Sequence, residues 1–231
     1  MTENKLSPLD ERHRALGAKM ADFGGWDMPI EYPGGGVVRE HTAVRERVGI
    51  FDVSHLGKAT VKGAGALDFV NSCLTNDLRK IGPGQAQYTM CCDESGGVVD
   101  DLIVYVKAED DLFLIPNAAN TAEVVRRLEE AAPEGIEVAD AHEEYAVLAV
   151  QGPKSDEVVS ALALPVDHDY MSFDEADWQG RPVTVCRTGY TGEDGFELIV
   201  YNSDAAQLWE ELLKAGAEYD LKPCGLAARD S

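Results

Sequence analysis

Paired β-rich runs constrain the fold of this chain more than any other feature of its sequence. The run VVDDLIVYV is closely followed by DDLFLIPN, and PVTVCRT is followed by FELIVY after a glycine-rich connection. Strands joined by short connections form antiparallel hairpins. Stretches with helical character lie between the runs, at 64–74, 121–131, 155–162 and 203–217. The sequence therefore predicts the α+β class, with helices packed on antiparallel sheets.

The N-terminal part predicts two further helices. Ser7 has the features of an N-cap, because Pro8 follows at the first helical position and acidic residues follow in the first turn. Apolar residues at helical spacing then mark one face of a second helix at 37–48. At the other end, PCGLAARDS reads as a loop that opens a short helix. A helix start without a body predicts that the chain is a fragment of a longer protein.

The charge balance is strongly acidic and restricts the possible partners. The chain has 42 acidic and 20 basic residues, with a formal net charge of −22. Such a surface repels nucleic acid and anionic membranes, so neither is expected as a partner. Two interpretations remain: an ordinary solvated surface, or adaptation to molar salt, which screens the self-repulsion. We favour the second, because the acids are spread along the chain.

Composition also bears on compartment and metal binding. No apolar run has the length needed to span a bilayer, and the N-terminal residues lack an apolar signal core, so a cytoplasmic location is expected. The five cysteines form no CxxC pair, and the histidines show no zinc-ligand spacing. We therefore expect reduced cysteines and neither a disulfide framework nor a metal site.

The stretch TGYTGEDGFEL, at 188–198, has the most unusual spacing of glycines. A phosphate loop is not indicated, because the residues after Gly195 are strand-like and the loop itself carries Glu193 and Asp194. The simplest interpretation is a hairpin connection whose glycines supply positive φ. Glu197 does not fit that interpretation, since a carboxylate inside an apolar strand is partly desolvated and needs donors.

The paired aspartates of GGVVDDLIVYV repeat this anomaly. Strand alternation places Asp101 on the face of Ile103 and Tyr105, and Asp100 on the opposite face. Asp100 is expected to solvate or cap the turn after the two glycines. For Asp101 two readings stand side by side, a buried structural carboxylate and a functional one. Together with Glu197, it could form an acid/base pair or bind the amino and amide groups of a heterocycle.

Several stretches together resemble one family, the aminomethyltransferase (T protein) of the glycine cleavage system. They are LGAKMADFGGWDMPIEY, VGIFDVSHLGK, LTND, GGVVDDLIVYV, NAAN, VQGPK, RTGYTGEDGFEL and GLAARDS, which occur in family order across nearly the whole chain. The resemblance implies three domains around a central folate, two of them present in this chain and the third absent. It further implies a split first folate-binding domain, 1–49 with 139–231, and an inserted second domain at 50–138.

The resemblance also implies a reaction. An aminomethyl group on the lipoyl arm of the H protein is transferred to tetrahydrofolate, which yields methylenetetrahydrofolate, ammonia and the dihydrolipoyl carrier. The lipoylated H protein is thus the implied partner and tetrahydrofolate the implied co-substrate, without a metal. Asp101 matches the catalytic aspartate and Glu197 the pterin-contacting glutamate. The remaining folate positions correspond to Tyr88, Tyr170, Tyr190 and Arg229, with weaker matches at Leu56 and Asn117.

Two alternative functions remain within the same superfamily. One is a folate-dependent demethylase that takes one-carbon units from methylated amines or sulfonium compounds. The other is a non-catalytic folate-binding protein that supports iron–sulfur assembly. Members of the last group typically carry a KGCY-like loop, whereas this chain has RTGYTGEDG. The motif therefore favours an enzyme.

Overall fold

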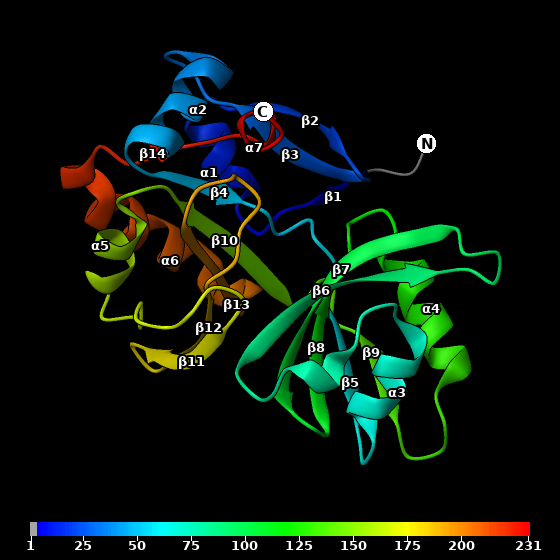
Figure 1. The fold of residues 1–231 in the computed structure, drawn as a ribbon. Helices are drawn as coiled ribbons and strands as arrows, with labels where there is room; N and C mark the ends of the chain where they lie inside the picture. The colour runs from blue at the N-terminus through cyan, green and yellow to red at the C-terminus, as the bar shows by residue number, and fades with distance from the viewer. Residues whose placement is uncertain (1–3) are drawn as a thin grey trace. The chain divides into compact units, whose positions relative to one another are not determined.

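The computed structural model describes residues 4–231 and divides the chain into two compact units (Figure 1). Unit 1 combines the residues up to His55 with 145–170 and 174–231, and unit 2 comprises 56–144 with 171–173. Both units are antiparallel sheets with packed helices, so the predicted α+β class is confirmed. None of the helices in the described part of the chain has the length and apolar character required to cross a membrane.

Unit 1 is built on a six-stranded sheet with the order β11-β12-β13-β10-β4-β14. The strands are β4 (Gly49–Asp52), β10 (Tyr145–Gln151), β11 (Phe173–Trp178), β12 (Arg181–Cys186), β13 (Gly195–Tyr201) and β14 (Lys222–Pro223). Strand β13 pairs with both β12 and β10 in antiparallel register, as the hairpin pattern predicted for the first of these pairs. The short β14 runs parallel to its neighbour, β4.

Two helices pack on this sheet, α5 (Ser155–Ser160) and α6 (Asn202–Ala215), and a 3₁₀ turn at Gly216–Tyr219 follows α6. Helix α6 buries Leu208, Trp209 and Leu212 on the sheet side. The facing strands are almost continuously apolar, and six of the seven residues of β10 are buried. Removal of these side chains from water is the main stabilising contribution of unit 1.

A three-stranded sheet completes unit 1 with three further helices. Its order is β1-β3-β2, with β1 at Lys5–Leu6, β2 at Lys19–Phe23 and β3 at Trp26–Glu31. The helices are α1 (Asp10–Ala15), α2 (Gly36–Glu46) and the short α7 (Leu226–Arg229). Helix α7 packs against β3 and α2, so residues from the two ends of the sequence lie side by side in unit 1.

A buried polar network ties the N-terminal residues to β4. His13 lies 2.8 Å from Asp52 through Nε2 and 2.8 Å from the Tyr32 hydroxyl through Nδ1. The Ser7 hydroxyl donates to Asp52 and also accepts from the Leu9 backbone N–H at 3.1 Å, but α1 begins later than predicted, at Asp10, and its N-cap is Leu9. Burial opposes ionisation of Asp52, but the hydrogen bonds that it accepts lower its pKa to about 2.

Unit 2 is a five-stranded antiparallel sheet with the order β6-β7-β8-β5-β9. The strands are β5 (Ala59–Lys62), β6 (Gln85–Cys92), β7 (Val98–Ala108), β8 (Asp111–Ile115) and β9 (Glu137–Asp140). The predicted hairpin of β7 and β8 is confirmed, since Tyr105 pairs with Phe113. Helices α3 (Ala66–Cys73) and α4 (Thr121–Ala131) pack on the sheet, and a 3₁₀ turn lies at Leu78–Lys80. The apolar core of unit 2 lies between these helices and the strands.

The unit boundaries differ by a few residues from the predicted domain boundaries at 50 and 138. Strand β4, at Gly49–Asp52, pairs with β10 in the sheet of unit 1, and β9, at Glu137–Asp140, pairs with β5 in the sheet of unit 2. The difference has a simple cause. A sheet is completed by strands that pair across large sequence separations, and such pairing leaves no local mark in the sequence.

Candidate functional site

The first group of predicted site residues lies on the β6–β7 hairpin of unit 2. Asp101 is half-buried on β7, and each of its carboxylate oxygens has a donor. The Tyr88 hydroxyl, from β6, donates to Oδ2 at 2.9 Å, and the Asn117 side-chain amide donates to Oδ1 at 3.1 Å. Tyr88 itself is 53% exposed. The structure therefore brings together Asp101, Tyr88 and Asn117, which the sequence placed in three separate motifs.

The neighbouring Asp100 is the buried member of the aspartate pair. It is 2% exposed and accepts hydrogen bonds from the Asn117 backbone at 2.9 Å and from the Asn120 side chain at 2.8 Å. The expectation that Asp100 solvates or caps a turn is wrong, and so is the expectation that burial falls on Asp101. The predicted alternation along β7 was correct, but the face of Asp100 is the core face, with Leu102, Val104 and Val106.

The second group lies in unit 1 and centres on Glu197. This residue is in the middle of β13, paired with Ala149 and Cys186, and only 7% exposed, as its apolar neighbours predicted. The Thr188 hydroxyl donates to Oε2. Burial raises the pKa of Glu197, while the Thr188 hydrogen bond and the positive charge of Arg229 act in the opposite direction. A buried acceptor of this kind suits a ligand that offers N–H donors.

A cavity of about 370 Å³ lies at the glycine-rich connection in unit 1. It is lined by Tyr170, Arg187, Thr188, Gly189, Gly192, Glu193, Asp194 and Gly195. Tyr170 is 70% exposed, so its ring is available to a flat ligand. Glu193, which lines the cavity, forms an ion pair with Arg45 of α2 at 2.8 Å. The glycine motif and one predicted folate position therefore line the same hollow.

Gln151, at the end of β10, holds this loop in place. Its amide nitrogen donates to the carbonyls of Thr188 and Phe196, and its oxygen accepts from the Thr191 hydroxyl at 2.8 Å. A Cβ at Gly189 would come within 2.1 Å of the Gln151 oxygen. Of the three glycines in the motif, only Gly192 has positive φ, so the predicted reason for the glycines was incomplete. Gly189 and Gly195 are needed for close approach to β10 instead.

Arg229, from α7, lies beside the same loop. Its guanidinium carbon is 4.7 Å from the centre of the Tyr190 ring, a cation–π arrangement. Despite this contact, the Tyr190 residue is 69% exposed. The charge of Arg229 also acts on Glu197, as noted above. Helix α7 thus brings the end of the chain to the glycine-rich connection, and it groups Arg229, Tyr190 and Glu197.

The last predicted residue, Leu56, is half-buried at the start of unit 2. Sequence reasoning missed the supporting roles of four residues: Asp100 and Thr188 bind the predicted Asn117 and Glu197, Asn120 binds Asp100, and Gln151 binds the glycine-rich loop. Asn120 and Thr188 lay inside motifs that were recognised, and Gln151 lay inside VQGPK. The roles of Asp100, Asn120 and Gln151 had no local signal, because each acts on a residue that is distant in sequence, whereas Thr188 faces Glu197 across the predicted hairpin.

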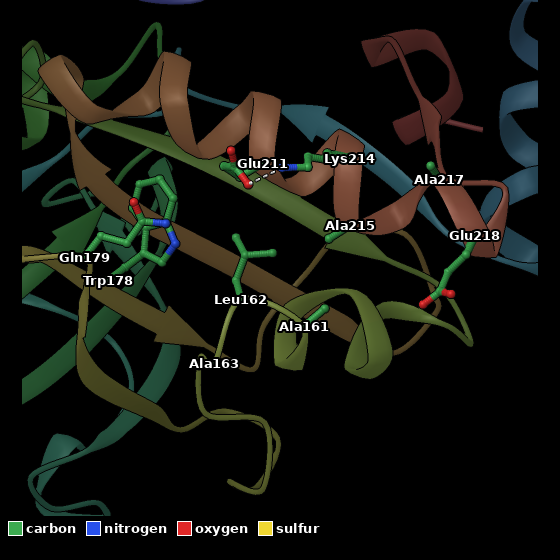
Figure 2. A pocket seen from close by; sticks show the side chains of 10 residues that line it. All are labelled: Ala161, Leu162, Ala163, Trp178, Gln179, Glu211, Lys214, Ala215, Ala217 and Glu218. Atoms are coloured by element: carbon green, nitrogen blue, oxygen red, sulfur yellow. Dashed lines mark ion pairs between the residues drawn. The ribbon is translucent and has the colours of Figure 1, made fainter.

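A larger cavity, of about 620 Å³, lies elsewhere in unit 1 (Figure 2). It is bounded by the end of α5, the β11–β12 turn at Trp178 and Gln179, and the end of α6, where Glu211 and Lys214 form an ion pair at 3.7 Å. None of the predicted site residues lines it. Within residues 4–231, no group of three or more His, Cys, Asp or Glu side chains is arranged to hold a metal ion.

Comparison with known proteins identifies the family to which this α+β chain belongs. The model of the GCVT N-terminal domain family matches residues 9–231. The chain belongs to this family. Among curated relatives, the aminomethyltransferase of Parafrankia sp. (strain EAN1pec) is 65% identical over 231 residues, 100% of this chain and 63% of the relative. The aminomethyltransferase of Mycobacterium tuberculosis (strain H37Rv) is 57% identical over 224 residues, 97% of this chain and 60% of the relative.

Two solved structures resemble this chain, one in fold and sequence and the other in fold alone. The glycine cleavage system aminomethyltransferase T from Bartonella henselae matches with a TM-score of 0.90 and 36% identity, over 98% of this chain and 61% of that one. The heterotetrameric sarcosine oxidase from Corynebacterium sp. U-96 matches with a TM-score of 0.61 at 17% identity, over 92% of this chain and 95% of that one, which shows a shared fold alone. The chain spans about three fifths of the length of its curated relatives.

Proposed function

We propose that this chain forms the N-terminal part of a tetrahydrofolate-dependent aminomethyltransferase of the glycine cleavage system. The observation that supports this most directly is the half-buried Asp101, whose two carboxylate oxygens accept from Tyr88 and Asn117. The high identity to curated aminomethyltransferases supports the same reaction. In that reaction the aminomethyl group of a lipoyl arm is transferred to tetrahydrofolate, and ammonia leaves.

Glu197 fits the requirements of a pterin-binding residue. The pterin ring of a folate presents ring and amino N–H groups, which need an acceptor shielded from water. Glu197 is such an acceptor, and it is held by Thr188 beside a cavity of about 370 Å³. Tyr170 and Tyr190 offer exposed rings for packing against flat surfaces of the ligand, and Arg229 supplies a positive charge. Leu56 is proposed as an apolar contact.

Asp101 is the proposed catalytic residue. Its fixed carboxylate can orient an amine and stabilise positive charge as it develops during carbon transfer. Tyr88 and Asn117 hold the carboxylate from two directions, which reduces the reorganisation needed in the transition state. The proposed partner that delivers the aminomethyl group is the lipoylated H protein.

We further propose that the enzyme works in the cytoplasm and that its acidic surface is an adaptation to high salt. The five free cysteines support a reducing compartment. The net charge of −22 supports the second idea. We also propose that unit 1 corresponds to the split first folate-binding domain and unit 2 to the inserted second domain.

Turnover tests the proposed function. The whole gene product that contains this chain is supplied with aminomethylated lipoyl H protein and tetrahydrofolate, and formation of methylenetetrahydrofolate is measured beside Asp101→Asn. We expect turnover by the unaltered enzyme and a loss of at least about 100-fold in the variant. Normal turnover by Asp101→Asn would remove Asp101 from its role. Turnover of methylated amines in place of the carrier would indicate a demethylase, and folate binding without either activity would indicate an assembly factor.

A further inference from the structure

Asp100 is a buried carboxylate that the proposed reaction does not use. Three donors surround it: the Asn117 backbone N–H at 2.9 Å, the Asn117 side-chain amide at 3.0 Å and the Asn120 side-chain amide at 2.8 Å. A carboxylate that is 2% exposed is tolerated only when its oxygens are satisfied in this way. Asn120 directs its side chain to Asp100, although it stands at the N-cap position of α4.

The Asn117 amide is the link between Asp100 and Asp101. Its nitrogen lies 3.0 Å from Oδ1 of Asp100, 2.8 Å from the backbone carbonyl of Asp101 and 3.1 Å from Oδ1 of Asp101. Three oxygens around one atom require a donor there, so the orientation of the amide group is determined by its surroundings. Two amide hydrogens are shared among three acceptors, and Asp100 contributes one of these acceptors.

We propose that Asp100 is a positioning residue that orients the Asn117 amide toward the carboxylate of Asp101. The inference rests on the proposed function, in which Asp101 acts on the amines. Asp100 also accepts from the backbone N–H of Asn117, so it fixes both the main chain and the side chain of that residue. Asn117 then holds Oδ1 of Asp101 while Tyr88 holds Oδ2. A supporting residue of this kind determines how precisely a catalytic group is placed.

A double-mutant cycle on kcat separates this role from a purely structural one. The variants are Asp100→Asn, Asn117→Ala and the double variant, measured in the whole gene product with saturating substrates. We expect each single variant to lose about tenfold in kcat, and the double variant to lose no more than Asn117→Ala alone, because Asp100 acts through Asn117. A double variant whose loss is the product of the two single losses would overturn the proposal.

Asp93→Asn is the matched control. Asp93 lies at the turn of the same hairpin and also accepts three hydrogen bonds, from Ser95 through its backbone and hydroxyl and from the Gly97 backbone. Its partners are unrelated to Asn117, so the variant should lower the melting temperature and leave kcat within about twofold. If Asp93→Asn and Asp100→Asn lower kcat equally, the effect of Asp100 is structural and the proposal fails.

The proposed function is tested separately: it fails if the unaltered enzyme does not form methylenetetrahydrofolate, and the role of Asp101 fails if Asp101→Asn turns over normally. If Asp100→Asn does not fold, hydrogen exchange of the Asn117 side-chain amide in the unaltered protein decides. The protein is produced with ¹⁵N-labelled asparagine, so that the side-chain amides are visible by NMR. The Asn117 signal is the one that is missing from the spectrum of the Asn117→Asp variant. Slow exchange of both amide protons supports the proposal, and exchange at the rate of a free asparagine side chain overturns it.

Discussion

Glu197 is an acidic residue in surroundings that favour its neutral form. It lies in the middle of β13, and burial raises the pKa of its carboxyl group above the ordinary value of 4.5. A carboxyl group with a raised pKa in the folded state stabilises the fold only while it is protonated. That contribution is complete below the pKa of the unfolded chain and is lost as the pH rises through the pKa of the folded protein. Above that range, ionised Glu197 costs stability.

Replacement of Glu197 by glutamine therefore should separate stability from binding. Glutamine keeps an oxygen that can accept from Thr188 but cannot ionise. We expect Glu197→Gln to melt at or above the temperature of the unaltered protein at pH 7.5, with the difference disappearing below pH 4.5. Affinity for tetrahydrofolate should fall at least about tenfold, since the glutamine amide replaces one of the two carboxyl oxygens with a donor. Calorimetry at several pH values and folate titration measure the two effects.

Glu210→Gln is the control, because this carboxylate is 61% exposed and its ion pair with Arg12, at 3.4 Å, lies on the surface. Its melting temperature should not rise relative to the unaltered protein as the pH increases. A lower melting temperature for Glu197→Gln at pH 7.5 would contradict the assignment of Glu197 as a destabilising charge.

At the scale of single residues, the sequence identified candidate site residues more reliably than it predicted how buried each of them is. The apolar neighbours of Glu197 were enough to predict its burial, because both faces of β13 are covered. The same reasoning failed for Asp100 and Asp101. Alternation separates their two faces correctly, but which face meets the helices depends on packing by α4, and local sequence carries no record of that contact.

Among the elements, strand β10 fixes the connection between β12 and β13 through the hydrogen bonds of its last residue. Gln151 binds the loop at Thr188, Thr191 and Phe196, and the backbone N–H of Gly152 donates to Asp194 at 2.8 Å. The loop consequently has a fixed shape without regular secondary structure. Close packing at Gly189 is part of this arrangement, because no space remains for a side chain there.

Gly189→Ala should therefore destabilise unit 1. The added Cβ would meet the Gln151 side chain at 2.1 Å and displace it from the loop. We expect the free energy of unfolding in urea to fall by about 2 kcal/mol, which is typical of overpacking, because the new group would press on the buried Gln151 side chain. Gly82→Ala is the control, since no atom lies within 4 Å of the added group there. Equal stability of the two variants would show that Gln151 can move without cost.

Prediction of the elements succeeded where the signal is local. The hairpins β7–β8 and β12–β13 and the helix α4 are encoded by short-range pattern, and each is present. Ser7 shows the limit. A serine before proline is a good N-cap locally, and its hydroxyl does accept from the Leu9 N–H, but it also donates to Asp52 of β4, a long-range partner that the local pattern does not reveal.

For the whole molecule, the net charge of −22 is the dominant property of the surface. Repulsion among like charges destabilises a compact state, and at 1 M salt the screening length is only about 3 Å. We expect the melting temperature to rise by several degrees between 0.1 and 2 M KCl, with the increase continuing above 1 M. A protein equally stable in dilute buffer would contradict adaptation to high salt, and an increase that ends near 0.2 M would reflect ordinary screening.

Most of unit 2 is one continuous segment, residues 56–144, and a backbone hydrogen bond lies near each end of it. Within unit 1, Val53 donates to the carbonyl of Val147 at 3.0 Å, and within unit 2, Ala141 donates to that of Lys58 at 2.9 Å. During synthesis, β4 leaves the ribosome long before β10, which begins at Tyr145. At about 5–20 residues per second the delay is roughly 5–20 s, ample time for most small domains to fold. Strand β4 therefore waits for β10, its neighbour in the sheet of unit 1, while most of the strands of unit 2 are being synthesised.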